Sequence, residues 1–306
     1  MERSRGVVFG VVAYLIWGAF PLYWPLLEPA GAFEILAHRL IWSLVVMTVL
    51  IIALRRTPQL LALVRDRRKL ALLALAAVTV TCNWATYIWG VNHGRVVETS
   101  LGYFVNPLVT MLLGVLVLHE RMRTVQWVAV GIATLAVVVL TVDYGRLPWL
   151  ALVLALSFGT YGLAKKKADA GAFESLALET ALMAPLALVF LVGLGLTGRS
   201  HFTSEGPGHA ALFVSAGVVT VVPLICFGAA AVRVPLVTLG LLQYLAPILQ
   251  FGLGVLHFHE DMSTGRWIGF AIVWVSLAVF TYDSLRARRP VVAPSRSAYT
   301  ANSEKA

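Results

Sequence analysis

The sequence has little charge, since only 13% of its 306 residues are charged and 59% are hydrophobic. Soluble domains carry about 25% charged residues and about 45–50% apolar ones. The shortage argues against a soluble enzyme, a nucleic-acid-binding protein and a disordered chain. The net charge of +9 does not restore a nucleic-acid partner, because the basic residues gather on one side of the predicted membrane segments.

Cysteine is scarce too. Cys82 and Cys226 both lie inside apolar runs, where two thiols do not make a disulfide framework and serve as small packing residues. The phosphate-binding pattern G-x-x-x-x-G-K-[ST] is missing, so the sequence gives no sign of ATP binding by that route. We expect no cofactor.

Long apolar runs are what the chain has in abundance. A helix needs about 20 mostly apolar residues to cross roughly 30 Å of hydrocarbon. The sequence predicts ten such helices, at residues 6–25, 33–54, 70–91, 97–118, 124–142, 147–164, 174–197, 209–231, 234–257 and 264–285. We therefore expect an all-α integral membrane protein without an inserted soluble domain.

The basic residues set the predicted orientation. If the N-terminus is cytoplasmic, 19 of the 24 Lys and Arg residues fall on the cytoplasmic side and four fall on the other, with Arg39 inside a span. Cytoplasmic loops carry such an excess in membrane proteins. We expect both termini to be cytoplasmic, in agreement with an even number of spans.

The second half of the chain repeats the first at an offset of 140 residues. Matches include Gly31-Ala32-Phe33-Glu34 with Gly171-Ala172-Phe173-Glu174, Pro107 with Pro247, His119-Glu120 with His259-Glu260, and Asp143 with Asp283. Each half holds five predicted spans, and because five is odd, the second half enters the membrane from the opposite side. The sequence predicts two inverted repeats, 1–145 and 146–286, and a disordered cytoplasmic tail at 287–306.

Inverted repeats favour a carrier, because two such halves build one site that opens to either side of the membrane. Two other classes are alternatives. An integral-membrane enzyme would need a convergent nucleophile, base or metal set at one membrane face, and no such set is evident. A channel or a non-transporting sensor stays open, and saturable flux stimulated by counter-substrate would separate a carrier from a channel.

Nine strings along the chain resemble one family. They are Glu34-Ile35-Leu36-Ala37-His38-Arg39, Asn83-Trp84, Tyr87-Ile88-Trp89, Ser100-Leu101-Gly102-Tyr103-Phe104-Val105-Asn106-Pro107-Leu108, Tyr161-Gly162-Leu163, Glu179-Thr180, Val222-Pro223-Leu224, Thr238-Leu239-Gly240 and Gln243-Tyr244. Together, over residues 6–285, they resemble the drug/metabolite transporter superfamily with its EamA-type five-helix repeats, and within it the RarD (chloramphenicol-sensitive protein) branch.

The resemblance implies a multi-pass permease of the bacterial cytoplasmic (inner) membrane, with helices around a central cavity. It implies a small organic substrate, a drug or metabolite, with amino-acid-like and chloramphenicol-type compounds as candidates. Export is the direction it favours, and a metabolite importer or exchanger is the alternative. Membrane lipid and coupling protons are the other expected partners, whereas substrate identity and oligomeric state are not predicted.

Two residues of opposite charge occupy equivalent positions, since Arg39 plus 140 is Glu179. Ionisable residues within spans usually face a cavity or a partner. The two side chains are predicted either to bind substrate or couple protons, facing each other across a cavity or pairing directly, or to form a structural ion pair. His38 is a second candidate proton carrier, because its side chain titrates near neutral pH, and packing is the alternative.

Further candidates come from polar and aromatic residues within spans. Asn83 needs an interhelical hydrogen bond in hydrocarbon, so it is either structural or cavity-lining. Trp84 and Tyr87 offer flat faces to an aromatic or cationic substrate. Trp17 lies too deep for a headgroup anchor and is predicted to line the cavity or to pack.

Two prolines at equivalent positions predict a pair of broken helices. Proline leaves a carbonyl unpaired, and such backbone is tolerated in a membrane where it lines a cavity or is buried in protein. The sequence therefore places a substrate site near these breaks, with simple kink packing as the alternative. The residues concerned are Tyr103, Asn106 and Pro107 in one half, and Gln243, Tyr244 and Pro247 in the other.

One further cluster, His257-Phe258-His259-Glu260-Asp261, has the composition of a metal site. Its repeat, His119-Glu120, is predicted at the opposite membrane face, so a shared metal is geometrically impossible. We predict no metal at either place and expect helix-end turns instead.

Overall fold

The computed structural model describes residues 2–119, 121–231, 233–234 and 236–286. All regular secondary structure in this part of the chain is helical. The elements are α1 (Glu2–Tyr23), the 3-10 helix η1 (Trp24–Leu27), α2 (Ala32–Ala53), α3 (Thr57–Arg65), α4 (Arg67–Asn92), α5 (Val96–Leu118), α6 (Thr124–Tyr144), α7 (Trp149–Ala168), α8 (Ala172–Leu196), α9 (Pro207–Ala231), α10 (Leu236–Leu242), α11 (Leu245–Leu256) and α12 (Thr264–Arg286). The predicted tail and Glu120 lie outside the described residues.

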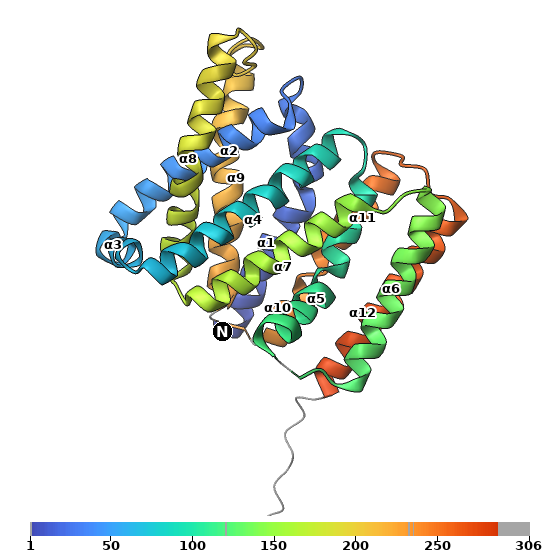
Figure 1. Cartoon of the computed structure of the whole chain (residues 1–306). Coiled ribbons are helices and arrows are strands. Elements are labelled where there is room, and N and C mark those ends of the chain that lie inside the picture. Colours follow the sequence, from blue (N-terminus) through green and yellow to red (C-terminus); the bar gives the residue numbers. More distant parts are fainter. Residues whose placement is uncertain (1, 120, 232, 235, 287–306) are drawn as a thin grey trace, which may run out of the picture.

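Nine spans within the described residues are long and apolar enough to cross a membrane. The sixth predicted span, 147–164, became α7, which has the length of a span but carries Lys165, Lys166 and Lys167 in its last turn. It packs against α4 and α5, and Figure 1 shows it running beside α4. The exact number of ten spans therefore stays a prediction.

The two proline-bearing spans differ from each other, where the sequence predicts a matched pair. Helix α5 continues through Pro107, whereas the ninth predicted run divides into α10 and α11 around Gln243 and Tyr244. Proline removes one hydrogen bond of a helix, and α5 absorbs that loss without ending. A break is present only in the second half.

Loops gather at the two ends of the bundle (Figure 1). We call one end the Glu260 face; it carries the loops at 28–31, 93–95, 145–148, 197–206 and 257–263. We call the other end the Arg56 face; it carries α3, the loops at 54–56 and 169–171, and residues 119 and 121–123. Helix α3 was not predicted, and its Leu63 packs in a buried cluster with Leu73 and Leu178.

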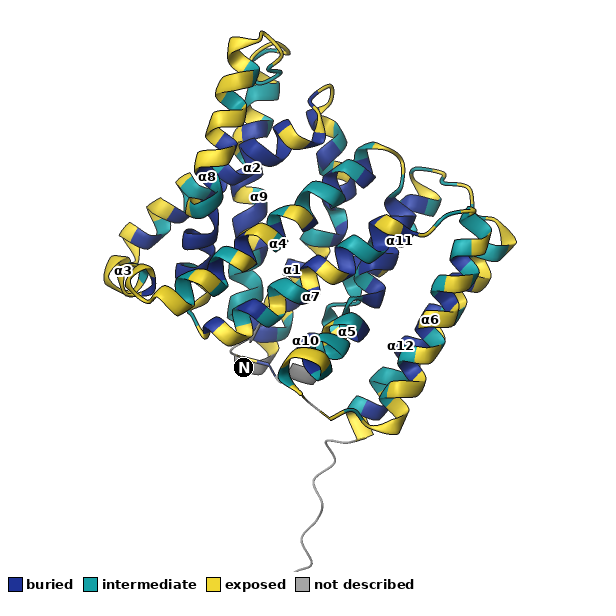
Figure 2. Cartoon of the chain, in the orientation of Figure 1, coloured by how far each residue is buried: buried dark blue, intermediate teal, exposed yellow. Residues whose placement is uncertain are grey.

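The sides of the bundle are apolar. Figure 2 shows exposed residues along the outer surfaces of α6, α8 and α12, and among them Leu196 is 84% and Val142 is 77% exposed. Apolar side chains in such number at the surface suit a hydrocarbon solvent, in which the helical backbone satisfies its own polar groups.

Residues 140 positions apart, which we call counterparts, make reciprocal contacts between α6 and α12. The Arg123 guanidinium donates from Nε to Asp283 at 2.9 Å. The counterpart pair is Ser263, whose hydroxyl donates to Asp143 at 2.6 Å. Each half of the chain thus completes the helix ends of the other half.

A second reciprocal set joins α2 and α8 to loops of the opposite half. Glu34 at the start of α2 accepts a 2.6 Å hydrogen bond from the His201 backbone N–H. Its counterpart Glu174 at the start of α8 pairs with Arg56 at 2.8 Å. The two contacts lie on opposite faces of the bundle.

Helix α9 approaches α2 closely at one glycine. A Cβ on Gly217 would lie 2.5 Å from the Trp42 backbone, so only glycine fits there. The counterpart of Gly217 is Ala77 on α4, and α4 packs much less extensively against α8 than α9 does against α2.

Candidate functional site

Arg39 lies in α2 and is 2% exposed. Aromatic rings enclose its guanidinium: its Cζ atom is 3.9 Å from the ring centroid of Trp84, 4.9 Å from that of Trp24 and 5.5 Å from that of Phe20. Cation–π contacts of this kind strengthen when water is excluded. They hold Arg39 and Trp84 in one fixed arrangement.

A hydroxyl from α9 completes this arrangement. The Arg39 Nε atom donates to Thr220 Oγ1 at 2.9 Å. Thr220 lies one helical turn beyond Gly217, and residues three apart share a helix face. The close approach at Gly217 therefore brings the hydroxyl to the guanidinium.

Glu179 lies in α8, is 2% exposed, and does not repeat the environment of Arg39. Its carboxylate pairs with Lys165 of α7, with Nζ and Oε1 3.0 Å apart. The Tyr161 side chain, also on α7, is the second polar group that contacts this carboxylate. The counterpart of Thr220 is Val80, which has no hydroxyl to offer.

Arg39 and Glu179 therefore have different partners. The physical reason is depth. Arg39 lies seven residues after the start of α2 at the Glu260 face, about 10 Å along the helix at 1.5 Å per residue. Glu179 lies seven residues after the start of α8, but that helix starts at the Arg56 face. Equivalent positions in oppositely directed helices lie at equal depths from opposite faces, which separates the two charges.

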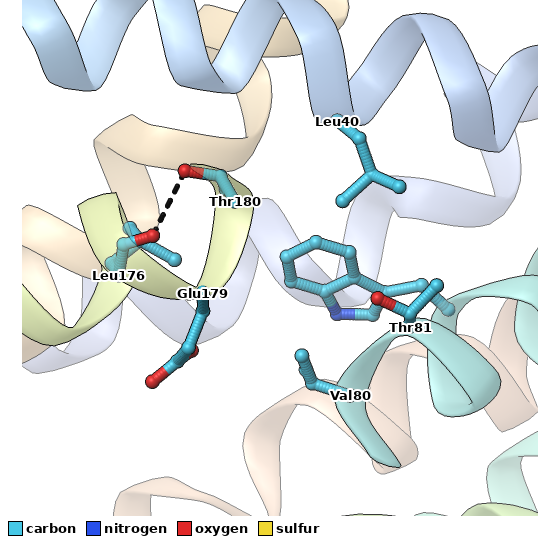
Figure 3. Close-up of a pocket in the computed structure, with 7 residues that line it drawn as sticks. Leu40, Val80, Thr81, Leu176, Glu179 and Thr180 are labelled. Carbon is cyan, nitrogen blue, oxygen red and sulfur yellow. Dashed lines mark hydrogen bonds between the residues drawn. The ribbon is translucent and has the colours of Figure 1, made fainter. Parts of the chain in front are cut away.

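A narrow crevice adjoins Glu179. Its lining includes Leu40 of α2, Val80, Thr81 and Trp84 of α4, and Leu176, Glu179 and Thr180 of α8. Figure 3 shows Glu179 extending from the same helix as Leu176 and Thr180, with Val80 on a neighbouring helix. Of the predicted site residues, the crevice brings together Trp84 and Glu179.

Asn83, Tyr87 and Tyr103 form a polar and aromatic group behind the crevice. The Asn83 amide donates to the Leu154 carbonyl at 3.0 Å and accepts from the Tyr103 hydroxyl at 3.0 Å. Tyr87 and Tyr103 meet edge to face at 5.6 Å between ring centroids. Asn83 is 1% exposed, and its contacts tie α4 to α7 and α5.

His38 is packed between two rings near the Glu260 face. It stacks on Phe202 with ring centroids 4.7 Å apart and lies 4.5 Å from Phe213. Its Nε2 atom has no hydrogen-bond partner among the described residues.

The remaining predicted residues lie away from the crevice. Trp17 packs against Tyr14 and Phe227, and its carbonyl accepts a 3.0 Å hydrogen bond from Gln250. Asn106 accepts a 3.3 Å hydrogen bond from Thr110. Gln243 and Tyr244 are partly buried and lie at the break between α10 and α11. Pro247 is buried in the first turn of α11.

Sequence reasoning missed four residues of this region. Phe20 and Trp24 are four residues apart in the first predicted span, a spacing that puts both on one helix face, and this signal was available. Lys165 belongs to a run of three lysines that we assigned to membrane topology. Thr220 carries no distinguishing signal apart from Gly217 three residues before it.

Comparison with known proteins gives the same family along the whole chain. Residues 4–142 match the EamA-like transporter family. A protein named Protein RarD from Streptomyces exfoliatus is 56% identical over 94% of this chain and 91% of its own length. The chain belongs to the EamA-type drug/metabolite transporter family, in its RarD branch.

Other relatives agree with this membership. A protein named uncharacterized transporter YojE from Bacillus subtilis is 40% identical over 94% of this chain and 97% of its own length. A solved structure titled only as the crystal structure of a protein has a TM-score of 0.60 at 19% identity, covering 93% of this chain and 99% of that one. That likeness concerns the fold. This EamA-type chain is accordingly a multi-pass bacterial membrane transporter.

Proposed function

We propose that the protein is a secondary-active permease that moves a small organic molecule across the bacterial cytoplasmic membrane by alternating access. Both termini are cytoplasmic in this proposal, and the two halves, 1–145 and 146–286, are inverted repeats that rock about one site. Export is the proposed direction, and it follows the family resemblance rather than a particular residue.

One observation carries the proposal, an apolar groove between α2 and α8. It encloses about 190 Å³ in the half of the bundle near the Glu260 face. Leu36 and Ala187 are among its lining residues, and Thr81 of α4 lies at its inner end. Phe33 and Leu186 at its edge are 63% and 68% exposed, so the groove opens sideways toward lipid.

The counterparts of these residues are packed together near the Arg56 face. Leu176 and Met47, the counterparts of Leu36 and Ala187, join Val221 in one buried hydrophobic cluster. Equivalent positions thus line a groove in the half of the bundle near the Glu260 face and pack together near the Arg56 face. Alternating access requires this asymmetry, because the two halves exchange conformations when the carrier turns over.

We propose protons as the coupling ion and Glu179 as the residue that carries them. The carboxylate is buried and contacts Lys165 and Tyr161; protonation ends the ion pair with Lys165, and the Tyr161 hydroxyl can stay beside the neutral carboxyl group. His38 is the alternative carrier, and its packing between two rings makes it the weaker one.

Flux through the purified protein in proteoliposomes tests the proposal. A mixed pool of amino acids, chloramphenicol and cationic dyes is offered with and without an imposed pH gradient, and mass spectrometry reads the contents. We expect saturable accumulation that follows the gradient and is stimulated by counter-substrate, with protein-free liposomes as the control.

The other outcomes are equally informative. Accumulation by exchange alone would replace proton coupling by metabolite antiport. Non-saturable flux would indicate a channel, and no flux from folded protein would favour a sensor. If Glu179→Gln keeps the pH dependence of transport, Glu179 is not the coupling residue.

A further inference from the structure

Glu179 is a buried carboxylate with incomplete pairing. It is 2% exposed, and its carboxylate contacts two polar side chains, Lys165 and Tyr161. Buried charges cost free energy unless they are both paired and hydrogen-bonded. A carboxylate has about four lone-pair sites, so these two contacts leave it able to accept further donors.

Lys165 does not depend on Glu179 for its position. Its Nζ atom also donates to the Ser175 hydroxyl at 2.7 Å and lies 5.2 Å from the Tyr161 ring centroid. The side chain is 24% exposed, so part of its charge is already solvated. Lys165 can release Glu179 and keep a hydrogen bond.

The crevice beside Glu179 adjoins the apolar groove, and in this conformation it has no room for a water molecule. Leu40 and Thr81 line both spaces, and Figure 3 shows their side chains on the side of the crevice opposite the helix that carries Glu179. Glu179 is the one charged residue in either lining. An apolar space therefore leads to a single negative charge.

Arg39 does not oppose this charge within the crevice. It is absent from both linings, and Trp84, which does line the crevice, covers its guanidinium at 3.9 Å. Arg39 is a positioning residue that holds Trp84 in place. The ring of Trp84 then offers a π surface beside Glu179, and such surfaces attract cations.

We propose that the substrate is an amphipathic organic cation whose ammonium group binds Glu179 in place of Lys165, with its apolar body in the groove between α2 and α8. This inference rests on the proposed function and names its substrate class. Substrate cation, Lys165 and proton compete for one carboxylate, so binding of the cation and of the proton exclude each other.

Binding of three probes that share a phenylethyl body to the full-length protein in detergent tests the charge preference. The probes are 2-phenylethylamine, neutral 2-phenylethanol and anionic 3-phenylpropanoate, and isothermal titration calorimetry at constant pH measures each Kd. We expect the amine to bind at least about tenfold more tightly than the alcohol, and the anion not to bind. Equal affinity for amine and alcohol, or preference for the anion, would overturn the proposal.

Three variants locate the site. Glu179→Gln removes the preference for the amine, whereas Glu205→Gln, at an exposed glutamate, keeps it. Lys165→Met removes the internal competitor and tightens amine binding by about threefold or more. Amine affinity that is unchanged in both Glu179→Gln and Lys165→Met would place the site elsewhere.

The groove has its own variant pair, which also applies if Glu179→Gln does not fold. Ala187→Phe fills the groove and weakens binding of amine and alcohol alike by about tenfold. Val189→Phe, on the same helix at a 73% exposed position, leaves both unchanged. Normal binding by Ala187→Phe would show that the apolar body lies outside the groove.

The binding assay tests the cation site and the flux assay tests the carrier function, so each proposal can be contradicted without the other. Amine binding at Glu179 without flux in proteoliposomes would retain the site and contradict the carrier. Flux of neutral or anionic compounds that Glu179→Gln leaves intact would retain the carrier and contradict the cation site.

Discussion

Arg39 and Glu179 stand at equivalent positions and are packed in opposite ways. Arg39 has three aromatic rings and a hydroxyl around it, whereas Glu179 contacts one lysine and one tyrosine. The neighbouring helices explain the difference. Gly217 lets α9 come close to α2, whereas α4, with Ala77 at the equivalent position, packs less extensively against α8. The two buried charges thus have different surroundings although they stand at equivalent positions.

Replacing Gly217 is expected to have the largest effect, because this glycine lets α9 pack closely against α2. In Gly217→Ala the new Cβ meets the Trp42 backbone at 2.5 Å, and overpacking of this kind costs about 3 kcal/mol. Chemical unfolding in detergent measures the loss, and transport falls with it. Gly131→Ala is the matched control, since its Cβ meets nothing within 4 Å. Equal stability of both variants would show that close approach does not hold α9 on α2.

A double-mutant cycle sharpens the comparison between the two charges. Arg39→Ala loses about 2 kcal/mol through its desolvated cation–π contacts, and Glu179→Ala loses about 1 kcal/mol or less because Lys165 is partly solvated. The double variant equals the sum within about 0.5 kcal/mol, as expected for residues without shared contact. A double variant no worse than Arg39→Ala would indicate that the two charges do interact.

Glu260 gives the smallest effect and shows what Glu179 lacks. Its carboxylate accepts from the backbone N–H groups of Val96 and Val97 at the start of α5. Burial nevertheless raises the pKa of Glu260 to about 7, against the lowering effect of these two bonds. The folded state therefore holds the proton more tightly than the unfolded state, and stability falls as the pH rises from about 4.5 to about 7.

Glu260→Gln removes this pH dependence and loses one acceptor, at a cost of about 1 kcal/mol. Unfolding measured across that pH range checks both effects. Asp261→Asn, at the exposed neighbouring position, keeps the slope of the native protein. A slope that survives in Glu260→Gln belongs to another group.

The helices followed from hydropathy wherever a run of about 20 residues was mostly apolar. The run at 33–54 became α2 at Ala32–Ala53. Helix α3 was missed because its nine residues are too few to span a membrane and follow Arg55 and Arg56. The break between α10 and α11 was predicted at the right segment, but the continuity of α5 was not, since proline alone does not determine whether a helix ends.

The site was predicted in its charged residues and missed in their partners. The offset of 140 identified Arg39 and Glu179 as equivalent, because equivalence is a property of sequence. Which side chain meets each charge depends on the distance between helices. The partners Thr220 and Lys165 come from α9 and α7, and no residue spacing within a single helix predicts them.

The reciprocal contacts between the halves have a consequence for biosynthesis. Asp143 ends α6 in the first half, but its partners Ser263 and Arg266 lie near the start of α12. Glu34 likewise accepts a hydrogen bond from the backbone of His201, in a loop of the second half. When the ribosome has made only the first half, these carboxylates have no partners, so that half remains an unfinished substrate for membrane proteases until the second half is inserted. Two halves expressed as separate chains would therefore protect each other from degradation, and neither would accumulate alone.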